Sequence, residues 1–175
     1  MTKSVDPGLS LTWRFLKYWR LMAIAAAVLA ADQASKAWIA ARLPFNTYGD
    51  GAGAIRVVRG FLYIVHVGNT GAAWSILSGR SILLATLAAA TLVAIFLGRR
   101  ALGLAAPHAQ GCFGLMCGGI AGNLADRLAR GHVVDFLDFH FGSYVYPTFN
   151  VADSAICVGV ALYAIYTLRS PGSPV

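Results

Sequence analysis

Long apolar runs separated by short polar stretches dominate this chain of 175 residues. An α-helix needs about 20 mostly apolar residues to cross the hydrocarbon core of a bilayer. Four runs approach or reach that length, at residues 18–39, 75–97, 102–124 and 149–168. The pattern therefore predicts an all-α integral membrane protein with four transmembrane helices.

The two longer polar connections, 41–74 and 125–148, carry shorter patterns. Residues 60–67 are rich in β-branched and aromatic side chains and are too few to span a membrane as a helix. We expect a strand there, in a small extracytoplasmic β-structure in the first outer loop, with His66 exposed to solvent. In the second loop, residues 131–139 alternate between apolar and polar and are predicted to lie along the membrane interface.

Composition supports a membrane location. The chain is 58% hydrophobic and 12% charged, with a mean hydropathy of +0.65, and a soluble domain of this size could not bury so much apolar surface. This composition excludes disorder, a coiled coil and a collagen-like chain. We expect one domain over residues 18–169, a cytoplasmic extension over 1–17 and a cytoplasmic tail over 170–175.

The charges predict the orientation, because Lys and Arg concentrate on the cytoplasmic side of membrane proteins. Of the 14 Lys and Arg residues, Lys3, Arg14, Lys17 and Arg20 lie before or at the start of the first run, Arg99 and Arg100 separate the second from the third, and Arg169 follows the fourth. Both termini are therefore expected in the cytoplasm, although the outer loops also carry basic residues. The net charge of +7 fits loops near anionic lipids, and no nucleic-acid-binding motif is present.

Two other features of the sequence have simple interpretations. The basic start, the apolar run and Leu29-Ala30-Ala31 resemble a cleaved signal peptide, an alternative that would leave only three helices. Cys112, Cys117 and Cys157 lie in apolar runs without metal-ligand spacing. We expect them to be small core residues, with neither a disulfide framework nor a metal site.

The third apolar run carries a set of small residues and then polar ones. Gly114, Gly118 and Gly122 recur every four residues and form a smooth helix face that a neighbouring helix can approach closely. Packing alone accounts for these glycines. It does not account for Asn123 and Arg127, which share one face at the outer end of the same helix.

Asp135 and Asp153 are candidates for chemistry at the outer surface. Asp135 follows the third run, as does Asp138, and Asp153 falls in the first turn of the fourth, three residues after Asn150. A plain helix cap formed by Asn150 and Asp153 is one interpretation. The other brings Asp135 and Asp153 together, so that one stays protonated while the other activates a water molecule for hydrolysis without a metal.

At these positions the chain resembles a known family, the lipoprotein signal peptidases (signal peptidase II) of bacteria. Four blocks occur in the family's order: residues 32–36 (DQASK), 69–75 (NTGAAWS), 118–127 (GGIAGNLADR) continuing into 133–136 (VVDF), and 149–153 (FNVAD). The resemblance implies an aspartic endopeptidase without a cofactor, whose catalytic pair is Asp135 and Asp153. It implies cleavage of prolipoproteins just before a diacylglyceryl-modified cysteine, by a monomer in the bacterial cytoplasmic (inner) membrane with its active site near the outer face.

The same resemblance implies roles for the surrounding residues. Asn123, Arg127 and Asn150 are expected to form a polar shell around the aspartates and the substrate, and four further positions to hold the outer β-structure to the helices: Asp32, Lys36, Asn69 and Gly71. Space beside Gly118 and Gly122 is hypothesised to admit acyl chains. Asp126 is expected to pair with Arg130, and Asp138 to be an interfacial charge.

Two other functional classes fit the bare pattern. A proton-coupled carrier would use the buried Asp and Arg residues as a relay, and a membrane scaffold would use the glycine face for assembly. Only the peptidase requires Asp135 and Asp153 for cleavage of a peptide bond.

Overall fold

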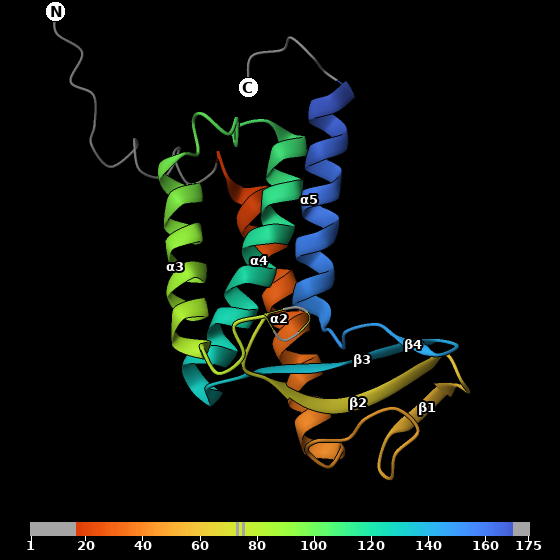
Figure 1. The fold of residues 1–175 in the computed structure, drawn as a ribbon. Helices are drawn as coiled ribbons and strands as arrows, with labels where there is room; N and C mark the ends of the chain where they lie inside the picture. Colours follow the sequence, from red (N-terminus) through yellow and green to blue (C-terminus); the bar gives the residue numbers. More distant parts are fainter. Residues whose placement is uncertain (1–16, 73, 75, 170–175) are drawn as a thin grey trace, which may run out of the picture.

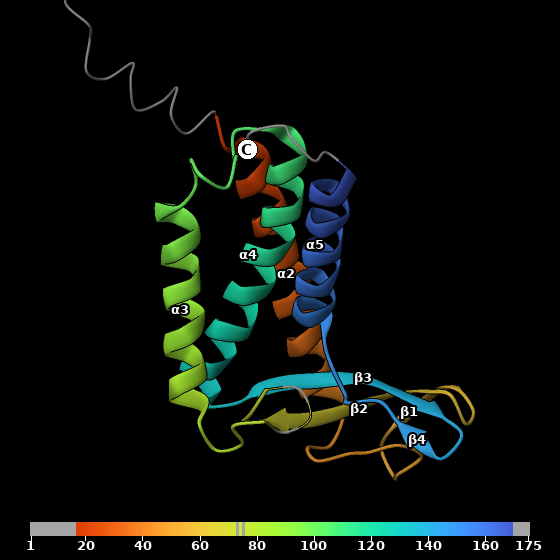
Figure 2. The same ribbon diagram turned by 45° about the horizontal axis from the view of Figure 1, so that its top comes forward.

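The computed structural model describes residues 17–72, 74 and 76–169. The predicted extension over residues 1–17 and the tail over 170–175 thus fall almost wholly outside the described residues. A bundle of four long helices stands on one face of a small sheet (Figures 1 and 2). The helices are α2 (Trp19–Arg42), α3 (Ser81–Leu97), α4 (Pro107–Arg130) and α5 (Val151–Arg169).

Each helix matches one predicted run, but two of them start later. The run at 75–97 begins with turns, and α3 starts at Ser81. The run at 102–124 also begins with turns, because Pro107 lacks the N–H that a helix interior needs and instead occupies the start of α4. The helix then continues to Arg130 and ends at Gly131, whose φ of 75° is the left-handed conformation of a helix C-terminus.

The β-structure is larger than the sequence predicts, because both outer loops contribute to it. The first loop supplies β1 (Ile55–Val58) and β2 (Leu62–Asn69), and the second supplies β3 (Val133–Phe141) and β4 (Tyr144–Val145). The strands are antiparallel in the order β1-β2-β3-β4. The prediction of β-structure in the first outer loop is therefore confirmed, but it missed the two strands of the second loop. The second loop meets β2 through long-range pairing, which an alternating pattern alone does not reveal.

His66 lies inside the fold rather than in solvent. Its side chain is 7% exposed, and its Nδ1 lies 3.1 Å from the carbonyl oxygen of Leu43. The ring of Phe45 packs edge-on against it. The segment after α2 folds back over β2 and pairs Thr47 with His66, so the expectation of a solvated strand residue is wrong.

Helix α4 is the central element, with close neighbours in α2 and α5 and a further contact to α3. Its glycine face packs directly against α2. A Cβ atom added at Gly118 would lie 2.7 Å from the carbonyl oxygen of Ala25 and 2.7 Å from Cβ of Val28, and one at Gly122 would collide with the carboxylate of Asp32. The hypothesis that this face leaves room for acyl chains is therefore wrong, and the alternative of close helix packing holds.

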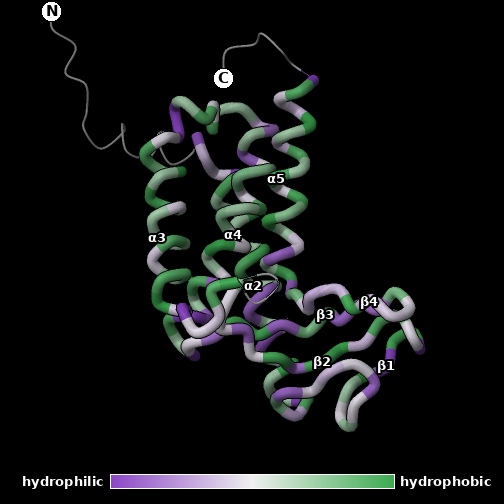
Figure 3. Tube along the Cα trace, viewed as in Figure 1, coloured by the Kyte–Doolittle hydropathy of each residue, from purple (hydrophilic) through white to green (hydrophobic). Residues whose placement is uncertain are grey.

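The outward surface of the bundle is apolar. Figure 3 shows hydrophobic positions along the lengths of the helices and hydrophilic ones gathered toward their ends and the sheet. Large side chains such as Ile82 of α3 and Leu168 of α5 are 85% and 79% exposed, a pattern opposite to that of a soluble core. Among the described residues, one helix, Val151–Arg169, is both long and apolar enough to span a membrane on its own. Ser81–Leu97 is apolar but shorter.

Candidate active site

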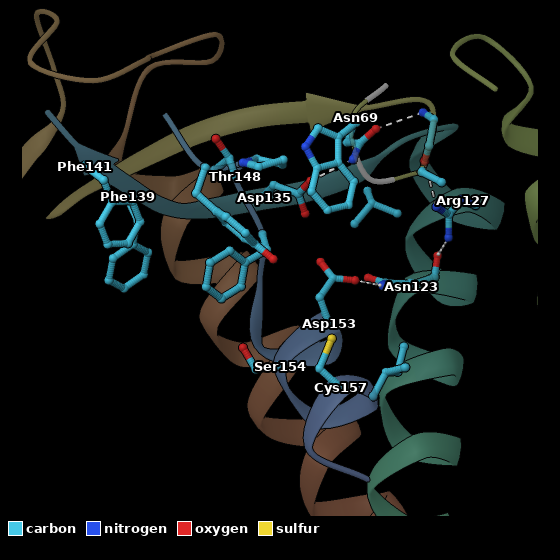
Figure 4. Close-up of a pocket in the computed structure, with 18 residues that line it drawn as sticks. Asn69, Asn123, Arg127, Asp135, Phe139, Phe141, Thr148, Asp153, Ser154 and Cys157 are labelled. Carbon is cyan, nitrogen blue, oxygen red and sulfur yellow. Dashed lines mark hydrogen bonds between the residues drawn. The ribbon is translucent and has the colours of Figure 1, made fainter. Parts of the chain in front are cut away.

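Asp135 and Asp153 face one cavity between the sheet and the end of the bundle. Figure 4 shows both carboxylates turned toward this space, Asp135 from β3 and Asp153 from the first turn of α5. The cavity has a volume of about 530 Å³. Opposite Asp135, the β2–β3 register shifts between Ile64 and Val67, and such bulges re-aim side chains next to active sites. Asp135 and Asp153, which are 18 positions apart in the sequence, thus share one space, and we call this pair the dyad.

Three asparagines fix the dyad through hydrogen bonds. The Nδ2 atoms of Asn150 and Asn69 donate to Oδ1 and Oδ2 of Asp135, at 2.6 and 2.9 Å. Nδ2 of Asn123 donates to Oδ1 of Asp153 at 2.7 Å. Since each carboxylate receives side-chain amide donors from other elements, its orientation is set before any substrate arrives.

The structure forms the helix cap that Asn150 and Asp153 were expected to make. Oδ1 of Asn150 accepts the backbone N–H of Asp153 at 2.9 Å, and Oδ2 of Asp153 accepts the backbone N–H of Asn150 at 3.3 Å. This reciprocal pair is a capping box at the start of α5. The Nδ2 atom of the same Asn150 side chain reaches Asp135, so capping α5 and assembling the dyad use one residue.

Burial changes the acidity of the dyad. Asp135 is 2% exposed, and desolvation together with the nearby negative charge of Asp153 raises its pKa to about 7. Hydrogen bonds from Asn69 and Asn150 oppose this rise without cancelling it. At neutral pH the dyad can therefore hold a proton that an exposed aspartate would have lost.

Behind the dyad lies a buried ion network centred on Lys36. The Nζ atom of this lysine lies 2.8 Å from Asp32 and 2.9 Å from Asp126, and it donates to Oδ1 of Asn123 at 2.9 Å. Asp32, Lys36 and Asp126 are all completely buried. Asp126 also pairs with Arg130, as the spacing predicts. The lysine thus connects two carboxylates to the asparagine that holds Asp153.

The network also corrects the expected roles of Asp32 and Lys36. Oδ1 of Asp32 accepts the backbone N–H of Ala152 at 3.0 Å, so it ties α2 to α5. Lys36 ties α2 to α4. These two residues join helices to one another, whereas Asp126 reaches the sheet by accepting the backbone N–H of Val134 at 3.1 Å.

Asn69, Gly71 and Arg127 connect the first outer loop to α4 beside the cavity. The backbone N–H of Gly71 donates to Oδ1 of Asn69 at 2.9 Å, while the guanidinium of Arg127 donates to the carbonyl oxygen of Gly71 at 3.0 Å. The Nε atom of Arg127 is buried without a hydrogen-bond partner among the described residues. Asn69 and Gly71 therefore hold the loop against the sheet and α4, as the sequence predicts.

An aromatic wall lines the far side of the cavity and was not predicted from the sequence. It consists of Trp74, Phe139, Phe141, Tyr146 and Phe149. The alternation of Phe139 and Phe141 along β3 is the signal that could have indicated it, because residues two apart on a strand share a face. The wall makes most of the cavity apolar around two polar acids.

Two other expectations about this region are wrong. Asp138 is 2% exposed, and its Oδ2 lies 2.9 Å from both the backbone N of Gly49 and Nε2 of His140. It therefore holds the loop after α2 against β3 and is not an interfacial charge. Cys157 is exposed and lines the site cavity, and Cys117 is half-buried; only Cys112 is a buried core residue.

All three cysteines are free thiols. Within residues 17–72, 74 and 76–169, no three His, Cys, Asp or Glu side chains lie close enough together to ligate a metal ion. The polar groups that line the cavity are carboxylates, amides, a guanidinium group, hydroxyls and the thiol of Cys157.

Comparisons with known proteins agree with this arrangement. The fold resembles a bacterial membrane enzyme solved by the in meso method at 2.3 Å resolution, with a TM-score of 0.75 and 33% identity over 87% of this chain and 89% of the other. A second bacterial membrane enzyme, solved at 1.9 Å, gives a TM-score of 0.72 over 86% of this chain and 93% of its own. Fold and site thus define a helical membrane enzyme.

The sequence comparisons identify the family. Residues 24–169 match the model of signal peptidase (SPase) II. The lipoprotein signal peptidase of Nitratidesulfovibrio vulgaris is 37% identical over 163 residues, covering 89% of this chain and 93% of its own. That of Xanthomonas oryzae pv. oryzae is 39% identical over 160 residues, covering 85% and 89%. The chain belongs to the signal peptidase II family and is therefore a peptidase, which sets aside the carrier and the scaffold.

Proposed function

We propose that this protein is an aspartic endopeptidase that removes signal peptides from prolipoproteins carrying a diacylglyceryl group, cutting just before the lipid-modified cysteine. The observation that carries the proposal is the pair of hydrogen-bonded carboxylates facing one cavity. The names of the relatives, lipoprotein signal peptidases, support the substrate class.

The mechanism follows from a shared proton. The ionised aspartate of the dyad takes a proton from the water molecule that attacks the peptide carbonyl. The protonated aspartate donates a hydrogen bond to the carbonyl oxygen. As the C–N bond breaks, the dyad passes a proton to the nitrogen, so that the new N-terminus leaves as an amine. A pKa of about 7 at Asp135 supports this division, because two adjacent carboxylates that share one proton supply a base and an acid together.

The cavity suits a substrate with lipid and peptide parts. Its apolar lining, including Phe139 and Tyr146, matches acyl chains or apolar side chains next to the bond to be cut. Arg127, with a buried Nε that lacks a hydrogen-bond partner in the described structure, stands at the polar side. A lipid anchor on the cysteine would hold the scissile bond at the depth of the sheet, beside the dyad.

The membrane arrangement is part of the proposal. Four membrane-spanning helices, both termini in the cytoplasm and the site near the outer face of the inner membrane fit two observations. The exposed surface of the bundle is apolar, and the start of α2 and the end of α5 lie at the end of the bundle away from the sheet (Figure 1). We further propose that a monomer suffices, since one chain supplies both aspartates.

The test is cleavage by purified protein of a diacylglyceryl-modified prolipoprotein, with EDTA present. We expect one cut before the modified cysteine, and losses of at least about 1,000-fold in rate for Asp135→Asn and for Asp153→Asn. The matched control is Asp50→Asn, because Asp50 is exposed and bonded only to Arg56 among the described residues.

Three results would contradict the proposal. The first is no cut at that position by pure, folded wild-type protein. The second is a wild-type rate in both Asn variants of the dyad, and the third is loss of cleavage in EDTA. A substrate lacking the diacylglyceryl group tests the lipid requirement separately, and equal rates on both substrates would contradict that part alone.

A further inference from the structure

A second cavity lies at the end of the bundle away from the sheet, between α2, α3 and α4. Its volume is about 680 Å³, and its walls include Leu21, Leu92, Ile95 and Leu104. On α3 the lining includes Leu92, Ile95 and Phe96, and Arg99 and Arg100 continue it in the turns after the helix. This long apolar space, which we call the terminal groove, shares no lining residue with the site cavity.

Three cations line the terminal groove: Lys17, Arg99 and Arg100. In the described part of the chain none of them forms a salt bridge, and no described aspartate lines the groove. Arg99 is held in place, because its NH1 donates to the carbonyl oxygen of Phe96 at 2.7 Å and its guanidinium lies 4.5 Å from the centre of the Phe96 ring. Within the described residues, the groove therefore combines apolar walls with positive charge that no carboxylate balances.

The terminal groove also lies beside α3, the helix that is packed least tightly in the bundle. Helix α3 packs mainly on α4, and its one buried residue is Ala85. A ligand lying between α2 and α3 would fill the space that side chains leave open. It would therefore couple α3 to the rest of the bundle.

We propose that the terminal groove binds an anionic phospholipid from the leaflet on the side of the chain termini. An acyl chain lies along Leu92 and Ile95, and the phosphate contacts Lys17, Arg99 and Arg100. Guanidinium groups bind phosphate oxygens through paired hydrogen bonds, and basic pockets between helices recognise acidic head groups. A second copy of this chain fits less well, because the same cations would face one another across a symmetric contact.

Native mass spectrometry of the detergent-purified protein, without substrate, tests this site. Dioleoyl phosphatidylglycerol and dioleoyl phosphatidylcholine are titrated in parallel, so that only the head group differs. We expect wild type to retain phosphatidylglycerol preferentially. Removing both arginines in an Arg99→Gln, Arg100→Gln variant should weaken its binding about 30-fold, from about 1 kcal/mol for each cation near a lipid surface.

The matched control removes two other cations at the same end of the bundle, in an Arg20→Gln, Arg169→Gln variant. Neither residue lines the groove, so this variant should keep wild-type affinity. Ile95→Trp, which fills the groove and keeps its charges, should also lose the lipid. As a second readout, phosphatidylglycerol should raise the melting temperature of wild type and the control variant only. A single cooperative unfolding transition without lipid shows that each variant is folded.

Several results would overturn the proposal. Equal retention of the two lipids would remove the role of the anionic head group, and equal losses in the two double variants would indicate general surface charge. If the wild-type protein is a dimer and the Ile95→Trp variant is a monomer, a second copy of the chain occupies the groove. Stronger lipid binding after deletion of residues 1–16 would assign it to the chain's own extension. Because binding is measured without substrate, these results are independent of the peptidase proposal.

Discussion

At the scale of single residues, the site depends on side chains that each bond to more than one other residue. Lys36 contacts Asp32, Asp126 and Asn123 at once, and Asn150 serves both α5 and Asp135. A buried lysine between two carboxylates has its charge balanced. Asp135 instead accepts hydrogen bonds from neutral amides. Its negative charge is therefore less stabilised than the charges of the carboxylates beside Lys36.

This difference predicts a pH dependence of stability. Folding raises the pKa of Asp135 from 3.8 to about 7, so the folded state binds the proton more tightly than the unfolded state. The stabilisation from that proton is complete below pH 3.8 and is lost as the pH rises through about 7. Wild type should therefore melt at a lower temperature at pH 8 than at pH 5.

The Asp135→Asn variant isolates this effect, because its side chain cannot titrate. Between pH 5 and pH 8 its melting temperature should fall by several degrees less than that of wild type, measured by thermal unfolding in detergent. Asp50→Asn, at an exposed position, should keep the wild-type pH dependence. Identical slopes for wild type and Asp135→Asn would contradict the raised pKa.

At the scale of elements, close packing of α4 on its neighbours holds the site residues together. Gly118 meets α2, whereas a Cβ added at Gly119 would collide with the backbone of α5. With small residues on opposite sides, α4 can approach both helices. Asn123, one turn further along, thereby reaches Lys36 of α2 and Asp153 of α5.

Gly118→Ala should therefore destabilise the bundle. Its Cβ would lie 2.7 Å from the backbone oxygen of Ala25, and such overpacking costs about 1–3 kcal/mol. Gly111→Ala on the same helix is the matched control, because its Cβ would meet nothing within 4 Å; there the better helix propensity of Ala should leave stability unchanged or raise it. Thermal unfolding compares the two, and equal melting temperatures would refute the packing role.

Several features at this scale could be predicted from the sequence. Apolar runs located all four helices, and the order of short motifs located the dyad. The starts of α3 and α4 were misplaced because Ile76, Leu77 and Leu102 in the preceding turns are as apolar as the helices themselves. The burial of His66 and Asp138 depends on the segment after α2 folding over the sheet, a contact between distant parts of the chain that no local pattern specifies.

At the scale of the whole molecule, the two ends of the bundle differ in chemistry. The described aspartates gather at the sheet end, whereas Arg99, Arg100 and Arg169 lie at the other (Figure 1). Charge of this kind orients a membrane protein during insertion. The proposed arrangement thus places the dyad and the cationic end on opposite sides of one membrane.

Labelling of single cysteines tests that arrangement. In a background with the three native cysteines replaced by Ala, Asp50→Cys and Arg100→Cys each place one thiol at an exposed position. In intact spheroplasts a membrane-impermeant maleimide should label the first and not the second, and lysis should expose both. Labelling of both before lysis, or of Arg100→Cys alone, would contradict the orientation, and retained cleavage activity verifies that each variant is folded.

The two aspartates of the dyad lie on different elements, and this has a consequence for how the protease folds. Asp135 belongs to β3 and Asp153 to the first turn of α5, and Asn150 bonds to both. A newly made chain whose final helix has not docked has no paired carboxylates, since the bonds that cap that helix also assemble them. If the dyad catalyses cleavage as proposed, proteolytic activity therefore requires that α5 has docked on the rest of the chain.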